Sequence, residues 1–301
     1  MKQLLTLIED VAGECLSSAF SLWSQTAVID YWEHASSETC TEVLDGLRDG
    51  TVPGATAMAP ALGQLCGLGD VPLVAHRDGH SLSVSGHVAW ASHLWDGAVV
   101  VAPVRVPEEG AAERWVIAFR VGAPGVTLHP APSLLALNGT GSSSLTLADV
   151  VVHVDRILST DMAGFVSEVR PRLLLAQSAM CAGLARRSVN EARARTAVWD
   201  SPLRTVADAR LADVAAVADG VLHRLDDWSD RSAEIEIAAL MQLRLDAAAV
   251  AARATDLEVL VSGGAGFLST SATSRRLREA AFLPIQAPTE LQLLRQLSAS
   301  G

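Results

Sequence analysis

Apolar side chains recur every three to four residues near the start of the chain. Between residues 3 and 48 they include Leu4, Leu5, Ile8 and Val11, with few glycines or prolines among them. This period is typical of an amphipathic helix. We therefore expect two or three helices, closed by the turn-forming run Arg-Asp-Gly-Thr-Val-Pro-Gly at 48–54.

From residue 55 to about 158 the period changes. Short β-rich runs alternate with Gly, Pro, Asp and Asn, and the segment Leu-Ser-Val-Ser at 82–85 alternates apolar and polar residues. Strict alternation predicts a half-buried strand, and several short strands at close spacing predict a small barrel or sandwich. The expected strands are 81–85, 98–104, 115–120, 126–129 and 145–154.

Beyond Asp161 the helical period returns. Segments rich in Ala, Leu and Arg cover 162–197, 203–228 and 231–261, and the run Trp-Asp-Ser-Pro at 199–202 separates the first two. The pattern predicts a bundle of three to four helices. The fold class is thus expected to be α+β, with a truncated N-terminal helical domain (1–52), a small β-barrel middle domain (53–158) and a C-terminal helical bundle (159–301).

Charge and composition narrow the function. The 301 residues include 23 Lys and Arg against 34 Asp and Glu, a formal net charge of -11. Neutralising phosphates needs clustered basic residues, so a nucleic-acid surface is not expected. No run of about 18 apolar residues occurs, and the four cysteines form no CxxC pair. We expect a cytoplasmic protein that neither spans a membrane nor holds a structural metal.

The C-terminal third contains a series of short motifs. Leu-Val-Ser-Gly-Gly-Ala-Gly-Phe at 260–267 is followed by Arg-Arg-Leu-Arg-Glu-Ala-Ala-Phe at 275–282 and Ile-Gln-Ala-Pro-Thr-Glu at 285–290. This order resembles the C-terminal signature of acyl-CoA dehydrogenases, as a short and divergent member. The resemblance covers about residues 54–297, and the predicted order of helices, β domain and helical bundle agrees with that family. It implies a flavoprotein with FAD as cofactor.

Two further motifs lie in the β-rich part. The run 54–63 resembles the family loop that passes the flavin pyrimidine, with Met58 where a hydroxyl residue is usual. The run 85–92 resembles the segment that places an aromatic plane beside the isoalloxazine and a hydroxyl near its N5. Trp90 and Ser92 keep that spacing. The alternatives are a plain turn for the first run and an ordinary core strand for the second.

The resemblance implies three more cofactor contacts in the helical part. Gly263 and Gly264 would bring the backbone close to the flavin dinucleotide of a partner subunit, although a helix C-cap explains such glycines equally well. Arg195, or Arg193 beside it, would grip the pyrophosphate with its planar fork. Leu260 stands where the family usually has Gln.

The expected catalytic base is missing. Counting back from Thr289, Ala287 occupies the position of the family's catalytic Glu, and a methyl group cannot remove an α-proton. Glu290 and Glu168 are the candidates to replace it. The short N-terminal region disfavours long fatty acyl chains. We therefore expect a flavin-dependent oxidoreductase acting on a small or carrier-linked acyl-type substrate, such as an acyl thioester.

Two alternatives stay open. A flavin-dependent monooxygenase of the same fold needs a flavin reductase partner but no carboxylate base. A degenerate, flavin-free member would serve as an interaction subunit, beside a full-length family partner. In either case the resemblance implies a homodimer or homotetramer, because the family completes its flavin sites across subunits.

The histidines suggest two other kinds of site. Ser92, His93 and Asp96 supply the three residue types of a Ser-His-Asp nucleophile. On a strand, however, adjacent residues point to opposite faces, so Ser92 and His93 cannot easily share a proton. His76, His80 and His87 are candidate ligands for a metal ion. The turn-like run Arg-Asp-Gly at 77–79 instead favours solvent-facing loop histidines.

Overall fold

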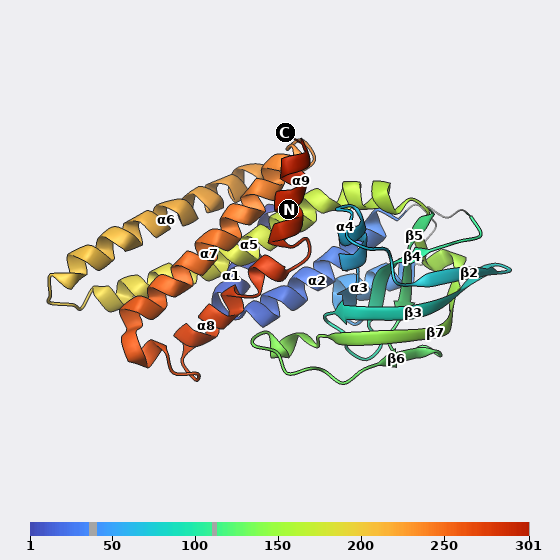
Figure 1. Ribbon diagram of the computed structural model, residues 1–301, viewed down its shortest axis with the longest axis horizontal. Helices are drawn as coiled ribbons and strands as arrows, with labels where there is room; N and C mark the ends of the chain where they lie inside the picture. Colours follow the sequence, from blue (N-terminus) through green and yellow to red (C-terminus); the bar gives the residue numbers. More distant parts are fainter. Residues whose placement is uncertain (36–40, 110–112, 301) are drawn as a thin grey trace. The chain divides into compact units, whose positions relative to one another are not determined.

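A computed structural model describes residues 1–35, 41–109 and 113–300 (Figure 1). Cys40 lies outside these described residues. The chain divides into two compact units: a helical unit of residues 1–20, 134–137 and 171–301, and a sheet unit of residues 21–133 and 138–170. The division passes within two helices, and the three-domain partition at 52/53 and 158/159 stays a prediction.

The first part of the chain forms the predicted helices. They are α1 (Lys2–Glu14), α2 (Leu16–Glu33) and α3 (Thr41–Asp49). In the sheet unit, Gln25 of α2 holds this region: its side-chain nitrogen donates to the carbonyls of Leu47 and Val52 at 2.7 and 2.9 Å, and its Oε1 accepts from the Gly54 N–H of the first strand at 2.7 Å. The turn-forming run after α3 is therefore held by hydrogen bonds from a helix.

Eight strands form the sheet of the second unit (Figure 1). They are β1 (Gly54–Thr56), β2 (Val74–Asp78), β3 (Ser81–Ala91), β4 (Val99–Arg105), β5 (Arg114–Arg120), β6 (Val126–Leu128), β7 (Ser143–His153) and β8 (Ile157–Ser159). Seven follow the order β6-β7-β3-β2-β4-β5-β8, and β1 pairs in parallel with β4. All five predicted strands are present. Strands β1, β2 and β8 were not predicted, and neither were the short helices α4 (Ala59–Gln64), η1 (Asn138–Thr140) and η2 (Val154–Arg156).

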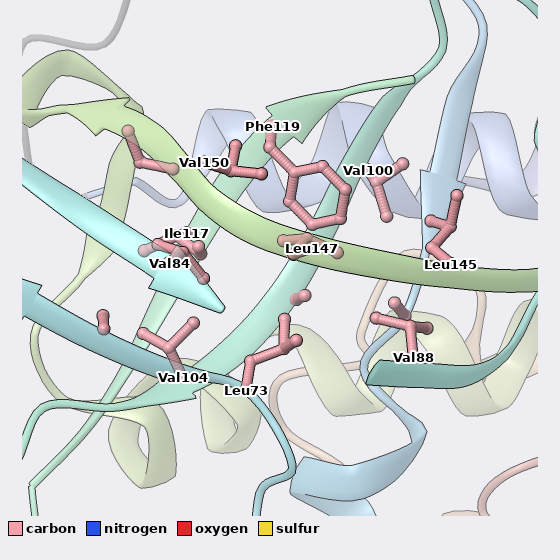
Figure 2. Close-up of a cluster of buried hydrophobic side chains, with 14 of the residues drawn as sticks. Leu73, Val84, Val88, Val100, Val104, Ile117, Phe119, Leu145, Leu147 and Val150 are labelled. Carbon is pink, nitrogen blue, oxygen red and sulfur yellow. The ribbon is translucent and has the colours of Figure 1, made fainter. Parts of the chain in front are cut away.

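Apolar side chains of distant strands meet in one core (Figure 2). Val84 and Val88 of β3 and Leu145 and Leu147 of β7 lie in the same buried cluster as Phe119 of β5. Strands β5 and β7 are also in contact, although they are not neighbours in the sheet order. The sheet therefore curls over its own core, as expected for a strand pattern with one apolar face.

The helical unit is built mainly from the C-terminal half. Its helices are α5 (Met162–Thr196, from Pro171 onward), α6 (Leu203–Trp228), α7 (Ile237–Gly266), α8 (Ala272–Ala280) and α9 (Glu290–Ser300), with the 3-10 turn η3 (Leu283–Ile285). Helix α7 packs against α6, α8 and α9. Helices α1 and α5 approach so closely that a Cβ on Gly183 would lie 2.1 Å from the carbonyl oxygen of Glu9. The three long helices were predicted, and α8 and α9 were not.

None of the helices in the described ranges combines the length and the apolar character needed to cross a membrane.

Candidate functional site

The loop between β1 and α4 is fixed by buried side chains. Met58 is the N-cap of α4 and is only 4% exposed. Two residues earlier, the Thr56 hydroxyl lies 3.3 Å from the hydroxyl of Tyr31 on α2. Burial raises the pKa of Tyr31 to about 12, so this phenol stays neutral at physiological pH. The loop thus keeps a defined shape without the hydroxyl and carboxylate residues usual in the family.

Trp90 stands out on the sheet because its large apolar ring is 60% exposed. The pairing of β3 with β7 shifts register between Val88 and Ala91, which turns the Trp90 ring outward at the end of the strand. Ser92 follows, and its hydroxyl lies 2.7 Å from that of Ser142. Ser142 in turn lies 2.6 Å from the hydroxyl of buried Thr140. The structure therefore presents an exposed indole and an oriented hydroxyl two residues apart.

The Ser-His-Asp arrangement is not formed. Strand β3 ends at Ala91, so Ser92 and His93 lie beyond the strand and need not point to opposite faces. His93 has a left-handed backbone with φ of 65°, and its Nδ1 lies 2.9 Å from the Gly54 carbonyl oxygen. Burial lowers the pKa of His93, partly offset by this hydrogen bond. Ser92 and His93 therefore have separate partners, and no histidine or carboxylate of the described residues is hydrogen-bonded to Ser92.

The placement of the loop histidines was partly wrong. His76 lies on β2 and His87 on β3, while the connecting turn is Gly79–His80, two residues later than predicted. Both strand histidines are exposed; His76 pairs with Glu108, and His87 contacts Thr146. Within the described ranges no three His, Cys, Asp or Glu side chains are grouped to hold a metal ion.

The glycine turn lies at the end of α7 in the helical unit. The helix runs through to Gly266, but Gly263 interrupts it with φ 58° and ψ -151°, a conformation open mainly to glycine. Apart from the adjoining backbone of the helix, no described atom lies within 4 Å of where a Cβ on Gly263 or Gly264 would be. Leu260 and Phe267, on either side, are 58% and 76% exposed. The backbone is thus accessible at this kink.

A groove between α6 and α7 begins one turn before that kink. It has a volume of ≈ 380 Å³, and its lining residues are Arg210, Asp213, Val214, Arg253, Asp256, Leu257 and Leu260. Arg193 and Arg195, in the last turn of α5, are exposed as well. The helical unit therefore offers several guanidinium groups, any of which can bind a phosphate.

The position of the missing base is occupied by a small, half-buried residue. The carbonyl oxygen of Ala287 accepts a hydrogen bond of 2.9 Å from Gln177 Nε2 on α5. In the same unit, Glu290 is the exposed first residue of α9. Glu168 belongs to the sheet-unit part of α5 and is exposed too. Neither carboxylate is held in place by a hydrogen bond in the described part of the chain.

Sequence reasoning missed a polar cluster behind Ala287. Arg244 of α7 is 2% exposed and contacts Gln177, Leu283 and Gln286. One signal was available: Arg244 occupies the apolar stripe of α7, in line with Leu240 and Ala247. An arginine at a core position of a helix indicates a buried polar network.

Comparison with known proteins gives the fold. No protein-family model and no curated protein matches the chain, whereas many solved structures do. A glutaryl-CoA dehydrogenase bound to glutaryl-CoA is 14% identical at a TM-score of 0.86, covering 98% of this chain and 78% of that one. Butyryl-CoA dehydrogenase from Megasphaera elsdenii is 19% identical at 0.82, with coverages of 98% and 80%. PigA with FAD and proline is 15% identical at a TM-score of 0.87, covering 98% of this chain and 81% of that one. This chain therefore has the fold of the acyl-CoA dehydrogenases.

Proposed function

We propose that the protein is a flavin-dependent oxidoreductase that binds FAD. The observation that carries the proposal is the 60% exposed indole of Trp90 beside the oriented hydroxyl of Ser92. Exposing a large aromatic ring to water is unfavourable, and a flat isoalloxazine ring is a suitable partner for it. FAD, when bound, supplies hydride acceptance at N5.

The sheet unit supplies the residues for the flavin ring. Trp90 would pack along it, and Ser92 would offer its hydroxyl as donor or acceptor. Met58 would contribute backbone groups of the α4 loop, because its side chain is buried and carries no strong hydrogen-bonding group. These roles fit the residues present, even though Met58 and Ala59 replace the polar pair of the family motif.

The helical unit supplies the residues for the dinucleotide. Gly263 and Gly264 leave their backbone open, and Arg195 carries an exposed guanidinium. We propose that these groups act on the FAD of a second copy, as in the homodimer or homotetramer implied by the resemblance. Leu260 offers no amide here, so phosphate binding would depend on arginine.

The chain's own acid-base chemistry is restricted. Ala287 holds no proton, and Glu290 and Glu168 are exposed carboxylates. A general base must reach its proton within hydrogen-bond distance. Removal of an α-proton from a small or carrier-linked acyl thioester would therefore require Glu290 or Glu168 to be oriented by the substrate.

A second candidate follows from Ala287. A flavin-dependent monooxygenase, which receives its electrons from a reductase partner, needs no carboxylate at this position. Neither Glu290 nor Glu168 is held by a hydrogen bond in the described part of the chain, which favours this alternative over a dehydrogenase. If the purified protein binds no flavin, the remaining alternative is a flavin-free interaction subunit.

The first experiment is the visible absorption spectrum of the purified protein, with and without excess FAD. The double variant Trp90→Ala with Ser92→Ala should lose bound flavin, while Trp95→Ala, which removes another partly exposed indole nearby, should keep it. Unchanged flavin occupancy in the double variant, or no flavin bound by the unmodified protein, would overturn the proposal.

The base is tested separately. Glu290→Gln and Glu168→Gln should both retain flavin, because neither residue belongs to the proposed cofactor contacts. If anaerobic reduction of the flavin by short acyl thioesters stops in only one variant, that residue is the base. If both variants are reduced at the unmodified rate, neither is the base.

A further inference from the structure

The polar cluster behind Ala287 joins three segments of the helical unit. Arg244 Nη2 donates to the Leu283 carbonyl oxygen at 2.6 Å and to Gln286 Oε1 at 3.4 Å. Its Nε donates to Gln177 Oε1 at 3.3 Å. The amide of Gln177 then donates to the Ala287 carbonyl oxygen at 2.9 Å. The guanidinium thus supports the whole corner that carries Ala287.

The charge of Arg244 has no counterion in this cluster. Its three acceptors are all neutral amide or carbonyl oxygens, and it forms no ion pair in the described part of the chain. A guanidinium stays protonated in proteins, so it cannot relieve burial by losing its charge. Burying an unpaired cation is strongly unfavourable. The cluster is therefore electropositive, and Nη1 remains able to donate.

Gln286 adds a second unmet donor. This residue is 3% exposed, and its Nε2 atom has no hydrogen-bond partner among the described residues. Turning the amide around would direct Nε2 toward Arg244, which needs an acceptor, so the assigned orientation is the favourable one. Gln286 also lies next to Ile285, which is 67% exposed. The unmet amide thus belongs to a buried residue that is one position along the chain from a solvent-exposed side chain.

We propose that Arg244 and Gln286 form a binding site for a carboxylate. A carboxylate is planar and has two acceptor oxygens, one for the remaining N–H groups of Arg244 Nη1 and one for the free amide Nε2 of Gln286. It also supplies the missing negative charge. The site lies at the corner of Ala287, so an acyl substrate or effector that reaches it would carry an acidic group. This site does not depend on bound flavin.

The test compares sodium butyrate with butyramide, its neutral counterpart, at constant ionic strength. Butyrate at ten times its dissociation constant should raise the Tm by about 2–4 °C, and butyramide should not. Gln286→Glu places an internal carboxylate against Arg244 and removes the free donor. This variant should have a higher Tm than the unmodified protein and no response to butyrate.

Two further variants make the result specific. Gln3→Glu adds the same charge at an exposed position of α1 and should leave the butyrate response unchanged. Arg244→Met should abolish the response; if it fails to fold, Gln286→Glu decides alone. Equal Tm shifts from butyrate and butyramide, or a response that persists in Gln286→Glu, would overturn the proposal, whatever the flavin spectrum shows.

Discussion

The sheet unit and the helical unit differ in the kinds of side chain that they bury. The sheet unit buries a large cluster of apolar side chains, with Leu, Val, Ile, Ala and aromatic residues from six of its strands. Among the described residues, five charged side chains are buried: Asp30 in the sheet unit, and Arg244, Glu258, Arg276 and Glu279 in the helical unit. Apolar burial stabilises without requiring a partner, whereas a buried charge depends on one. We therefore expect that replacing one buried charged residue of the helical unit lowers the free energy of unfolding strongly, because its partner is left unpaired.

The Glu258–Arg276 pair shows this dependence most clearly. Arg276 donates to both Glu258 oxygens at 2.8 and 2.6 Å, and Thr273 donates to the same carboxylate at 2.8 Å. The pair joins α7 to α8: Glu258 precedes the glycine kink of α7, and Arg276 lies on the helix that follows it. Glu279, also on α8, has a raised pKa because burial outweighs its pairing with Arg275.

The largest expected effect comes from breaking that pair. Glu258→Leu leaves the buried guanidinium of Arg276 without its hydrogen-bonded ion-pair partner, and the free energy of unfolding should fall by about 3–5 kcal/mol. Urea unfolding measures it. Adding Arg276→Met should restore most of the loss, because an apolar pair needs no counterion. A double variant as unstable as the single one would contradict the comparison.

The sheet core should respond differently. Leu145→Ala removes buried methyl groups and should lower the free energy of unfolding by about 2–5 kcal/mol through lost burial and a cavity. The milder Ile117→Val should cost about 1 kcal/mol. Unlike the ion pair, this loss should not change with pH. The same urea titrations at pH 7 and pH 4 check both statements.

The ion pair should give the helical unit a pH dependence. Burial raises the pKa of Glu258, but hydrogen bonds from Arg276 and Thr273 outweigh it and hold the pKa below 4.5. A carboxyl with a depressed folded pKa stabilises the protein above its unfolded pKa, and this stability is lost as pH falls through the folded value. Glu258→Gln should therefore lose less stability than the unmodified protein between pH 5 and the acid range. Parallel curves would show that Glu258 does not titrate differently on folding.

Surface charges should matter least. Arg231 and Asp227 form an i,i+4 pair in which both side chains are about half exposed, at 50% and 54%. Asp227→Asn should change the free energy of unfolding by no more than about 0.5 kcal/mol, because solvent screens the pair. A larger loss would mean that exposure is a poor guide to electrostatic strength in this unit.

Much of the architecture followed from periodicity. An apolar repeat runs along each of the long helices α5, α6 and α7 and each of the strands β4, β5 and β7. Such a local repeat is enough to predict these elements. The short strands β1 and β8 have three residues each, too few to show a period. They exist because β4 and β5 offer free edges. Helix α8 is mostly polar along its sequence, and it is held by buried ionic contacts.

The candidate site was predictable only in part. The sequence determined which residue types occur at motif spacing, including Trp90, Ser92, Gly263 and the loss of a carboxylate at Ala287. Tertiary structure alone decided that Trp90 points outward, that Ser92 bonds to Ser142, and that Arg244 meets Gln177 and Gln286. Spacing along a chain fixes which side chains are available, but the pairing of residues far apart depends on packing among several elements at once.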